Sequence, residues 1–503
     1  MSGGRNLSDL LDERSAAFDP IIVELRPGGE ERAVRIGEFK QTVAAAARAL
    51  WRLGFEPGAR IALIAENRAE YLAAYMAIMR AGLVAVPVNY KLPEQVVAHI
   101  LADSDCRLAF VDGPRRALAG SLPVVEFDSA GARGWERFLE PGSFQSVQPR
   151  PQDVAMVLYT SGSSGLPKGV PLTHAGHHWA VRGFDALRAA FEGRAVVVPA
   201  PFFHMNGLYS SKLLLRLGAT NLLMTRFNAA EYLKAVHRHR CPVVIAIPTM
   251  VALMARETET LKEVDLTCVQ AVILGSAPSS EALIAEVRRL FPNASITNSW
   301  GTTEAGPVCF GPHPKGLPRP PLSLGCPRPD VEVRLVGGSS DEGVLQVRTP
   351  ALMSGYLNRP EETAKRLKDG WYDTGDVMRR DGDGFYHFVG REDDMFICGG
   401  ENIYPAEVEK ILESHPEVTQ AAVVPAADAI KGQIPVAFVV RAPGARVNHE
   451  SLKQFALERG PAYAHPRHVL FRDQLPLAGT NKIDRKRLAQ EAADHVAAQP
   501  AKP

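Results

Sequence analysis

The sequence predicts an α/β fold with a large N-terminal domain and a small α+β C-terminal domain. From about residue 36, short aliphatic runs alternate with segments of helical periodicity, which indicates helices covering a sheet. The aliphatic runs are continuously apolar, and this favours mainly parallel strands buried on both faces. After about residue 310, prolines crowd together and strand-like runs with glycine-rich turns follow, which predicts a β-rich subdomain.

The first elements form one β-α-β unit. A helix is expected over residues 39–53, where apolar residues recur three and four apart and Gly54 can cap the end. Strands are expected at residues 60–65 and 83–88, on either side of a helix at 68–81. Further strand candidates lie at residues 154–159, 195–198, 221–224, 243–247, 271–274 and 295–298.

The expected secondary structure changes twice in the second half of the chain. Seven prolines between residues 312 and 329 exclude a regular helix, and strands are then expected at 331–336 and 344–348. From about residue 392 a smaller unit follows, with helices expected at 405–414 and 449–457 and strands near 418–425 and 435–441. We therefore predict one domain over residues 1–392 and a second over residues 393–503.

Composition excludes several classes of protein. The chain has 57 basic and 56 acidic residues, so no net charge attracts a nucleic acid or an anionic membrane. Its six cysteines are widely spaced and form no Cys-x-x-Cys pair, which indicates a reducing compartment and no structural zinc. No basic-apolar leader and no run of about 18 apolar residues is found, so we expect a cytoplasmic protein without a membrane span.

The strongest local motif is YTSGSSGLPKG at residues 159–169, directly after an expected strand. Its hydroxyl groups, its glycine-freed amides and the ammonium of Lys168 are suited to hold phosphates. It is not a P-loop, because that motif has four residues between its glycines and Ser or Thr after the lysine, so a P-loop phosphotransferase is excluded. A Gly/Ser-rich turn by itself is more often a plain loop.

This loop matches the [ST]-S-G-[ST]-[ST]-G-x-P-K-G motif throughout, and on it the chain resembles the adenylate-forming superfamily. Within that superfamily it resembles the AMP-forming acyl- and aryl-CoA synthetases, such as 4-chlorobenzoate:CoA ligase and fatty-acid:CoA ligases. Further family signatures follow in the family's order: WGTTE at 300–304, YDTGD at 372–376, GREDD at 390–394, GGEN at 399–402, PAEVE at 405–409, and Asn481 with Lys482 in TNKIDR.

The resemblance implies a function. It implies a carboxylic acid:CoA ligase that forms an acyl-adenylate from ATP and a small-molecule carboxylic acid, releases pyrophosphate, and then transfers the acyl group to coenzyme A with release of AMP. ATP, Mg²⁺ and CoA are the implied cofactors and substrates, the C-terminal domain is implied to be mobile, and a homodimer is left open. Two other functions also stay open: a stand-alone adenylation enzyme that loads a carrier protein, and a non-catalytic nucleotide-binding relative.

The resemblance also implies a role for each matched position. Catalysis is expected of Lys482, His204, Glu304 and Lys168. ATP or AMP is expected to contact Thr160, Ser161, Gly162, Ser163, Ser164, Gly165, Lys168, Ser276, Ala277, Pro278, Asn298, Ser299, Trp300, Gly301, Thr302, Thr303, Asp376, Phe388, Arg391 and Lys482. Thr160 and Glu304 are the expected metal site, Gly399, Gly400, Glu401 and Tyr463 the CoA site, and Asp393 the hinge. The acyl pocket is expected at Phe203, His204, Asn206, Gly207, Met250, Ser276, Gly301 and Val308.

Each of these residues also has a purely structural interpretation. From composition alone, His204 is more readily a hydrogen-bonded core histidine, Trp300 a core residue rather than a stacking platform for adenine, and Lys482 a solvated surface lysine. Glu304 is readily a surface carboxylate and Asp376 a turn residue.

Two positions depart from the family pattern, and the substrate stays open. Asn481 stands where the family commonly has glycine before the lysine, and Asn tolerates left-handed backbone better than other non-glycine residues. Residues 275–278 read GSAP where relatives often have G-G-A or G-E-A. The pocket residues are mostly apolar, so we expect an aromatic or short-to-medium aliphatic monocarboxylate, with Gly207 leaving room for it.

Overall fold

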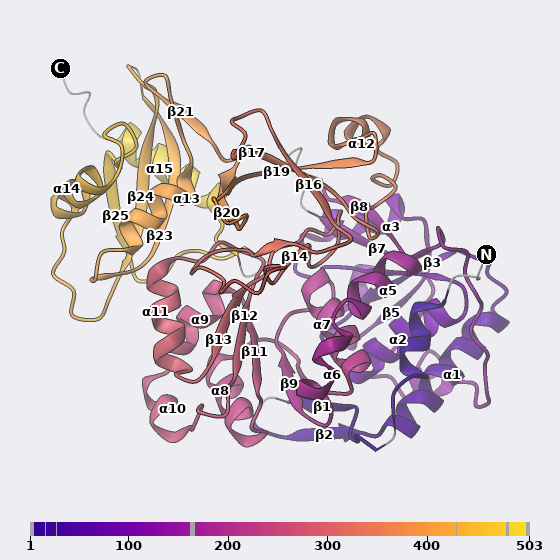
Figure 1. Cartoon of the computed structure of the whole chain (residues 1–503). Coiled ribbons are helices and arrows are strands. Elements are labelled where there is room, and N and C mark those ends of the chain that lie inside the picture. Colours follow the sequence, from indigo (N-terminus) through magenta and orange to yellow (C-terminus); the bar gives the residue numbers. More distant parts are fainter. Residues whose placement is uncertain are drawn as a thin grey trace.

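The computed structural model describes residues 5–498 except residues 16, 27, 161–165, 429 and 479–481. Figure 1 shows a large body built by the first two thirds of the chain and a smaller one, near the C-terminus, that contains β21 to α15. The predicted α/β class with a separate C-terminal domain is confirmed. None of the described helices is both long enough and apolar enough to cross a bilayer.

A six-stranded sheet with the order β6-β5-β3-β4-β7-β8 forms the first layer of the large domain. Its strands are parallel except β8, which returns antiparallel to β7. Helix α2 is buried along almost its whole length, because it packs against α1 as well as against the sheet. The elements are η1 (Leu7–Leu11), α1 (Ile36–Arg52), β3 (Arg60–Ile64), α2 (Ala69–Arg80), β4 (Val84–Pro87), α3 (Glu94–Asp103), β5 (Cys106–Val111), η2 (Gly113–Ala119), β6 (Val124–Glu126), α4 (Trp135–Phe138), β7 (Val154–Thr160), β8 (Lys168–Thr173) and α5 (His174–Arg182).

Two further sheets, with the orders β2-β1-β10-β9 and β11-β12-β13, complete the helix-covered part. Strands β11, β12 and β13 are parallel, so their carboxyl ends, and the loops that follow β12 and β13, lie at one edge. The elements are β1 (Ile22–Leu25), β2 (Glu31–Val34), η3 (Asp185–Leu187), α6 (Arg188–Phe191), β9 (Ala195–Val198), α7 (Met205–Leu217), β10 (Thr220–Met224), α8 (Ala229–Arg238), β11 (Val243–Ala246), α9 (Pro248–Ala255), α10 (Thr258–Glu263), β12 (Ala271–Leu274), α11 (Glu281–Leu290) and β13 (Ser295–Asn298).

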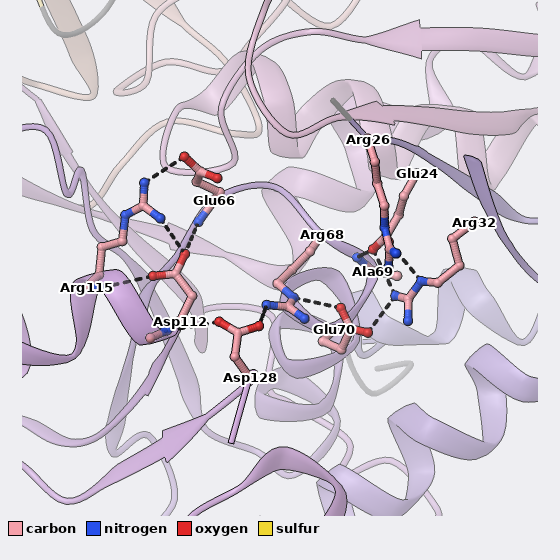
Figure 2. Close-up of polar contacts among 11 residues, drawn as sticks. Glu24, Arg26, Arg32, Glu66, Arg68, Ala69, Glu70, Asp112, Arg115 and Asp128 are labelled. Atoms are coloured by element: carbon pink, nitrogen blue, oxygen red, sulfur yellow. Dashed lines mark hydrogen bonds and ion pairs between the residues drawn. The ribbon is translucent and has the colours of Figure 1, made fainter. Parts of the chain in front are cut away.

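A network of arginines and carboxylates joins the first two sheets (Figure 2). The buried carboxylate of Glu24, in β1, accepts 2.8 and 2.9 Å hydrogen bonds from Arg32 and a 2.6 Å bond from the backbone N–H of Ala69, at the start of α2. Arg68 continues the network to Glu70 and Asp128. Because the negative carboxylate lies at the positive end of α2, the network stabilises the position of this helix.

The β-rich subdomain and the C-terminal domain follow. The subdomain contains a five-stranded antiparallel sheet, and the C-terminal domain contains a five-stranded sheet with its own apolar core. The predicted boundary after residue 392 falls between β20 and β21 and stays a prediction. The elements are β14 (Phe310–Gly311), β15 (Cys326–Pro327), β16 (Glu332–Val336), β17 (Glu342–Arg348), α12 (Pro360–Arg366), β18 (Leu367–Lys368), β19 (Trp371–Arg380), β20 (Tyr386–Arg391), β21 (Phe396–Cys398), β22 (Glu401–Ile403), α13 (Pro405–Glu413), β23 (Val418–Asp428), β24 (Gly432–Arg441), α14 (His449–Arg459), β25 (His468–Arg472) and α15 (Arg485–Ala497).

Candidate active site

The predicted site residues come from segments far apart in the sequence, and three contacts bring them together. Thr160, at the end of β7, meets Glu304, and Trp300 meets Asp376 in β19. Asn206, in the first turn of α7, meets Ser276, in the loop after β12. These contacts gather the ends of both helix-covered layers and the β-rich subdomain around one cleft.

Asp376 is held by two donors. Arg391 Nη1 donates to Asp376 Oδ1 at 2.6 Å, and the indole Nε1 of Trp300 donates to Oδ2 at 2.8 Å. Burial raises the pKa of Asp376, and the charges of Arg391 and Lys482 and the Trp300 hydrogen bond oppose that rise. The structure therefore gives Trp300 a positioning role toward Asp376, through its N–H. The stacking of its ring on adenine stays a prediction.

Glu304 fits the predicted metal site. Its buried carboxylate accepts hydrogen bonds from the hydroxyls of Tyr356, at 3.0 Å, and Thr160, at 3.5 Å, both to Oε1. No cationic side chain of the described residues forms an ion pair with it, and burial raises its pKa. A desolvated carboxylate beside a hydroxyl is a donor set suited to Mg²⁺. No described group of three His, Cys, Asp or Glu residues forms a complete metal cage, so phosphate and water oxygens would supply the other ligands.

Lys168 reaches the same cluster from the start of β8. Its ammonium pairs with Glu362 of α12 and lies 5.2 Å from the ring centroid of Tyr356. The predicted phosphate-loop residues Ser161, Gly162, Ser163, Ser164 and Gly165, and also Asn481, lie outside the described residues. Lys168 and Thr160 frame the two ends of that loop, so both ends lie beside Glu304 and Tyr356.

A cavity lies at the carboxyl ends of β12 and β13. Five predicted nucleotide-binding residues line it, together with residues that the sequence analysis did not single out. The lining residues are Leu274, Ala277, Pro278, Ser279, Asn298, Ser299, Leu322, Leu324, Phe388 and Lys410. The side-chain oxygen Oδ1 of Asn298 is buried without a hydrogen-bond partner among the described residues. A buried acceptor that lacks a donor suits a ligand with an N–H group, such as the adenine amine.

Lys482 lies close enough to His204 to lower the pKa of the imidazole. The Ala478 N–H donates a 2.7 Å hydrogen bond to the Lys482 carbonyl, and the charge of Lys482 perturbs the pKa of both Asp376 and His204. Burial lowers the pKa of Lys482, and Asp376 opposes the effect. Burial also lowers the pKa of His204 to about 4, so this imidazole is neutral at pH 7. Its Nε2 is buried and has no partner among the described residues.

Two polar residues of the predicted acyl pocket meet directly. Asn206 Nδ2 donates to Ser276 Oγ at 3.4 Å, and Ser210 Oγ donates to Asn206 Oδ1 at 3.1 Å, which fixes the amide orientation. Ser276 adopts a left-handed backbone with φ of 65°, at the position where the sequence departs from the family pattern. Phe203 and Met250 are buried and Val308 is half-buried, and their place around the polar pair stays a prediction.

Backbone fills the space next to Gly207 that the sequence analysis assigned to a substrate, and the place of this residue in the acyl pocket stays a prediction. A Cβ at this position would lie 2.5 Å from the carbonyl oxygen of Pro201 and 2.6 Å from that of Ala200. The glycine therefore allows α7 to approach its own preceding loop. Gly301 is similar, since a Cβ would lie 2.3 Å from the carbonyl oxygen of Pro307, although this glycine is exposed to the cleft. Thr302 caps the same turn by accepting the N–H of Ala305, and Thr303 beside it is half-buried.

The predicted CoA residues and hinge lie on or beside the C-terminal domain. Gly399, Gly400 and Glu401 form the exposed turn between β21 and β22, and Tyr463 is exposed as well. Among the described residues, no hydrogen bond or ion pair joins these four to the residues around Asp376 and Glu304. Asp393 accepts hydrogen bonds from Arg366 at 3.0 Å and from Arg391 at 3.2 Å, which ties the predicted hinge to the ribose end of the cleft. Their roles stay predictions.

Sequence comparison places this architecture in a family. Residues 14–357 match the AMP-binding enzyme family, and residues 407–482 match the AMP-binding enzyme C-terminal domain. The chain therefore belongs to the AMP-binding enzymes, and the predicted resemblance is confirmed. It is 34% identical over 486 residues to a feruloyl-CoA synthase of Amycolatopsis sp, covering 93% of this chain and 96% of the relative. It is 31% identical to the indoleacetate–CoA ligase of Aromatoleum aromaticum, covering 97% and 98%.

Solved structures share the fold. The crystal structure of the anthranilate CoA ligase AuaEII in complex with anthranoyl-AMP aligns with a TM-score of 0.87 at 23% identity, covering 99% of both chains. At this identity the likeness shows the fold alone.

Sequence reasoning missed three residues that the structure places at the cleft. Tyr356 and Glu362 hold Glu304 and Lys168, and Lys410 lines the cavity from the C-terminal domain. Tyr356 and Glu362 lie outside every quoted motif, so no signal distinguished them. Lys410 directly follows PAEVE in the sequence, and that adjacency was the one available hint.

Proposed function

We propose that this enzyme activates an aromatic monocarboxylate, with the residues of the cleft in the roles that follow. The chain is an AMP-forming carboxylic acid:CoA ligase. The observation that carries the proposal is the convergence of Glu304 with Thr160, Asp376 with Arg391, and Lys482 with His204 around one cleft. These three pairs supply the groups that the first reaction step requires, which are a metal ligand, an acceptor for ribose hydroxyls and a cation.

The adenylation step uses the charges of the cleft. A carboxylate oxygen of the acid attacks the α-phosphorus of ATP, the bond from that phosphorus to the bridging oxygen breaks, and pyrophosphate leaves. Glu304 and Thr160 would hold Mg²⁺, which would supply positive charge next to the phosphate oxygens. The ammonium of Lys482 interacts electrostatically with Asp376 and His204, and there it would stabilise the negative charge shared by the carboxylate and the α-phosphate.

Neutral His204 serves the acid rather than proton transfer. Since its pKa is about 4, the imidazole adds no charge next to Lys482 at pH 7. Its unpartnered Nε2 is available for a hydrogen bond with the carboxylate.

In the second step the CoA sulfur attacks the acyl carbon and AMP leaves. We propose that rotation about Asp393 withdraws Lys482 and brings the turn at Gly399 to Glu401 to the cleft.

An aromatic acid suits the pocket. Phe203, Met250 and Val308 supply apolar surface, and the Asn206–Ser276 pair supplies hydrogen-bonding groups for a ring substituent. The relatives whose names refer to feruloyl and indoleacetate groups support this class of acid.

We also propose a cytoplasmic location, where the six free cysteines stay reduced. Sedimentation velocity measures whether the protein is a monomer or the homodimer that the resemblance leaves open.

Pyrophosphate release, followed with a panel of aromatic and aliphatic acids in the presence of ATP and Mg²⁺, tests the proposal. We expect release to depend on the acid, to be fastest with an aromatic one, and to yield the acyl-CoA by mass spectrometry when CoA is added. Fastest release with acetate or a medium-chain fatty acid would contradict the aromatic assignment. A thioester formed only on a carrier protein would contradict the use of CoA.

A further inference from the structure

The cavity at the ends of β12 and β13 has a wall from each domain. Nine of its ten lining residues lie between Leu274 and Phe388, in the large domain and its β-rich subdomain. The tenth, Lys410, lies on α13 of the C-terminal domain, which packs against β20 and α11.

Lys410 is a cation without a counterion at this wall. Its Nζ donates to the carbonyl oxygen of Phe388 at 2.9 Å, and among the described residues no other hydrogen bond and no ion pair of the ammonium is found. Its neighbours on α13 are engaged elsewhere: Glu409 accepts two bonds from Arg485, at 2.6 and 2.8 Å, and Glu413 accepts the N–H of Ala421. Burial lowers the pKa of Lys410, and the charge of Glu407, one turn earlier on α13, opposes the effect, although no ion pair joins the two among the described residues.

The large domain contributes an acceptor without a donor to the same cavity. Asn298 is 8% exposed, and its Oδ1 has no partner among the described residues. An ammonium has three donors and no acceptor, whereas the amide oxygen only accepts. A ligand that satisfies both presents an N–H donor and a ring nitrogen acceptor, and a purine amine has this pattern.

We propose that Lys410 is a nucleotide-binding residue supplied by the C-terminal domain, which donates a hydrogen bond to a ring nitrogen of adenine while Asn298 accepts from the exocyclic amine. The inference rests on the proposed function, because it takes this cavity as the site of the ATP base. It follows that the base is fully bound only in the domain arrangement that also places Lys482 in the cleft. Base recognition and the position of the catalytic lysine are thereby coupled.

The test compares Lys410→Met, which keeps the apolar stem and removes the N–H groups, with Lys453→Met. Lys453 is a matched control because it lies on α14 of the same domain and pairs with exposed Glu450. Pyrophosphate release is measured with ATP and with 1-deaza-, 3-deaza- and 7-deaza-ATP. We expect Lys410→Met to raise the KM for ATP about tenfold with little change in kcat, and Lys453→Met to leave it unchanged.

The rates with the deaza nucleotides show whether Lys410 contacts a ring nitrogen of the base. The wild-type enzyme is expected to discriminate about tenfold against one of them, and Lys410→Met is expected to lose that discrimination. Thioester formation from a synthetic acyl-adenylate and CoA should be unaffected, because Lys410 leaves the cavity when the domain turns. Lys410→Gln, which retains an N–H donor, should recover part of the affinity for ATP.

The outcomes separate two failures. If wild-type enzyme releases no pyrophosphate with any acid, the proposed function fails. If it releases pyrophosphate but tolerates all three deaza nucleotides, or if Lys410→Met discriminates as the wild type does, Lys410 does not bind the base. Thermal unfolding of each variant checks its fold. If the variants do not fold, the wild-type enzyme still decides, because its tolerance of all three deaza nucleotides would overturn the inference.

Discussion

Asp376 and Arg391 are direct cross-strand partners in β19 and β20, and Arg391 Nη1 lies 2.6 Å from Asp376 Oδ1. Arg391 also donates to Asp393, the predicted hinge residue. One arginine therefore contacts both the carboxylate proposed to bind ribose and the residue about which the small domain is proposed to turn. The position of the small domain and the binding of nucleotide are linked through this side chain.

Trp300→Phe tests the positioning of Asp376. Phenylalanine keeps an aromatic ring but removes the N–H that lies 2.8 Å from Asp376 Oδ2. We expect the KM for ATP to rise about tenfold while the apolar contact with Phe310 persists. A KM unchanged by this substitution would mean that Asp376 needs only Arg391. The measurement is pyrophosphate release at varied ATP and saturating acid.

Tyr356→Phe tests the metal-binding carboxylate. The Tyr356 hydroxyl stabilises ionised Glu304, and burial has already raised the pKa of that carboxyl. Without the hydroxyl the pKa rises further, so Mg²⁺ binding should fail at a higher pH than in the wild type. We expect the acidic limb of the adenylation pH profile to move upward. A limb that stays in place would exclude Glu304 as the titrating group.

Glu413→Gln tests a titration at the domain interface. Burial raises the pKa of Glu413, which is hydrogen bonded to Ser280 at the start of α11, from the ordinary value of 4.5 to about 7. Protonated Glu413 contributes fully to the stability of the domain interface below about pH 4.5, where the carboxyl is protonated in both the docked and the undocked arrangement. This contribution is lost as the pH rises to about 7. We expect the arrangement with Lys482 in the cleft to weaken over this interval in the wild type and to be insensitive to pH in the variant. Fluorescence energy transfer between labels on the two domains measures it, and equal pH dependence in both proteins would contradict the assignment.

Gly207→Ala tests the role of Gly207 in the packing of the backbone. The added Cβ would meet two carbonyl oxygens at 2.5 and 2.6 Å, so we expect a loss of about 1–3 kcal/mol in the free energy of unfolding. Activity should fall by the same factor for small and large acids, because the substitution shifts backbone at the start of α7. Selective loss of the larger acids, measured as relative kcat/KM, would instead place Gly207 in the acyl pocket.

Much of the fold was predictable from the chain because its strands are continuous apolar runs. The exceptions carry charge or proline. Strand β5 was missed because Arg107 interrupts its apolar run, and β8 because it contains Pro171. Strand β1 was missed because Glu24 lies within it, and Arg32 and the N–H of Ala69, which bind this carboxylate, explain its burial.

The site was predictable where a local motif carries the chemistry, and not where a contact spans the fold. Glu304 and Asp376 lie within motifs, but their hydrogen bonds to Tyr356 and Trp300 join residues 52 and 76 positions apart. The space next to Gly207 was not predictable, because the sequence cannot show that carbonyl groups of the preceding loop approach this residue. Lys410 belongs to a second domain, so its place at the cavity depends on how the domains pack.

The central claim is that Lys482 serves adenylation alone, and separate assays of the two half-reactions of Lys482→Ala test it most directly. The lysine lies close enough to Asp376 and His204 to perturb their pKa values in the arrangement described here. Pyrophosphate release should fall by at least about a hundredfold, since one charge-stabilising donor is lost. Thioester formation from a synthetic acyl-adenylate and CoA should stay near the wild-type rate. Equal losses in both half-reactions would contradict the account.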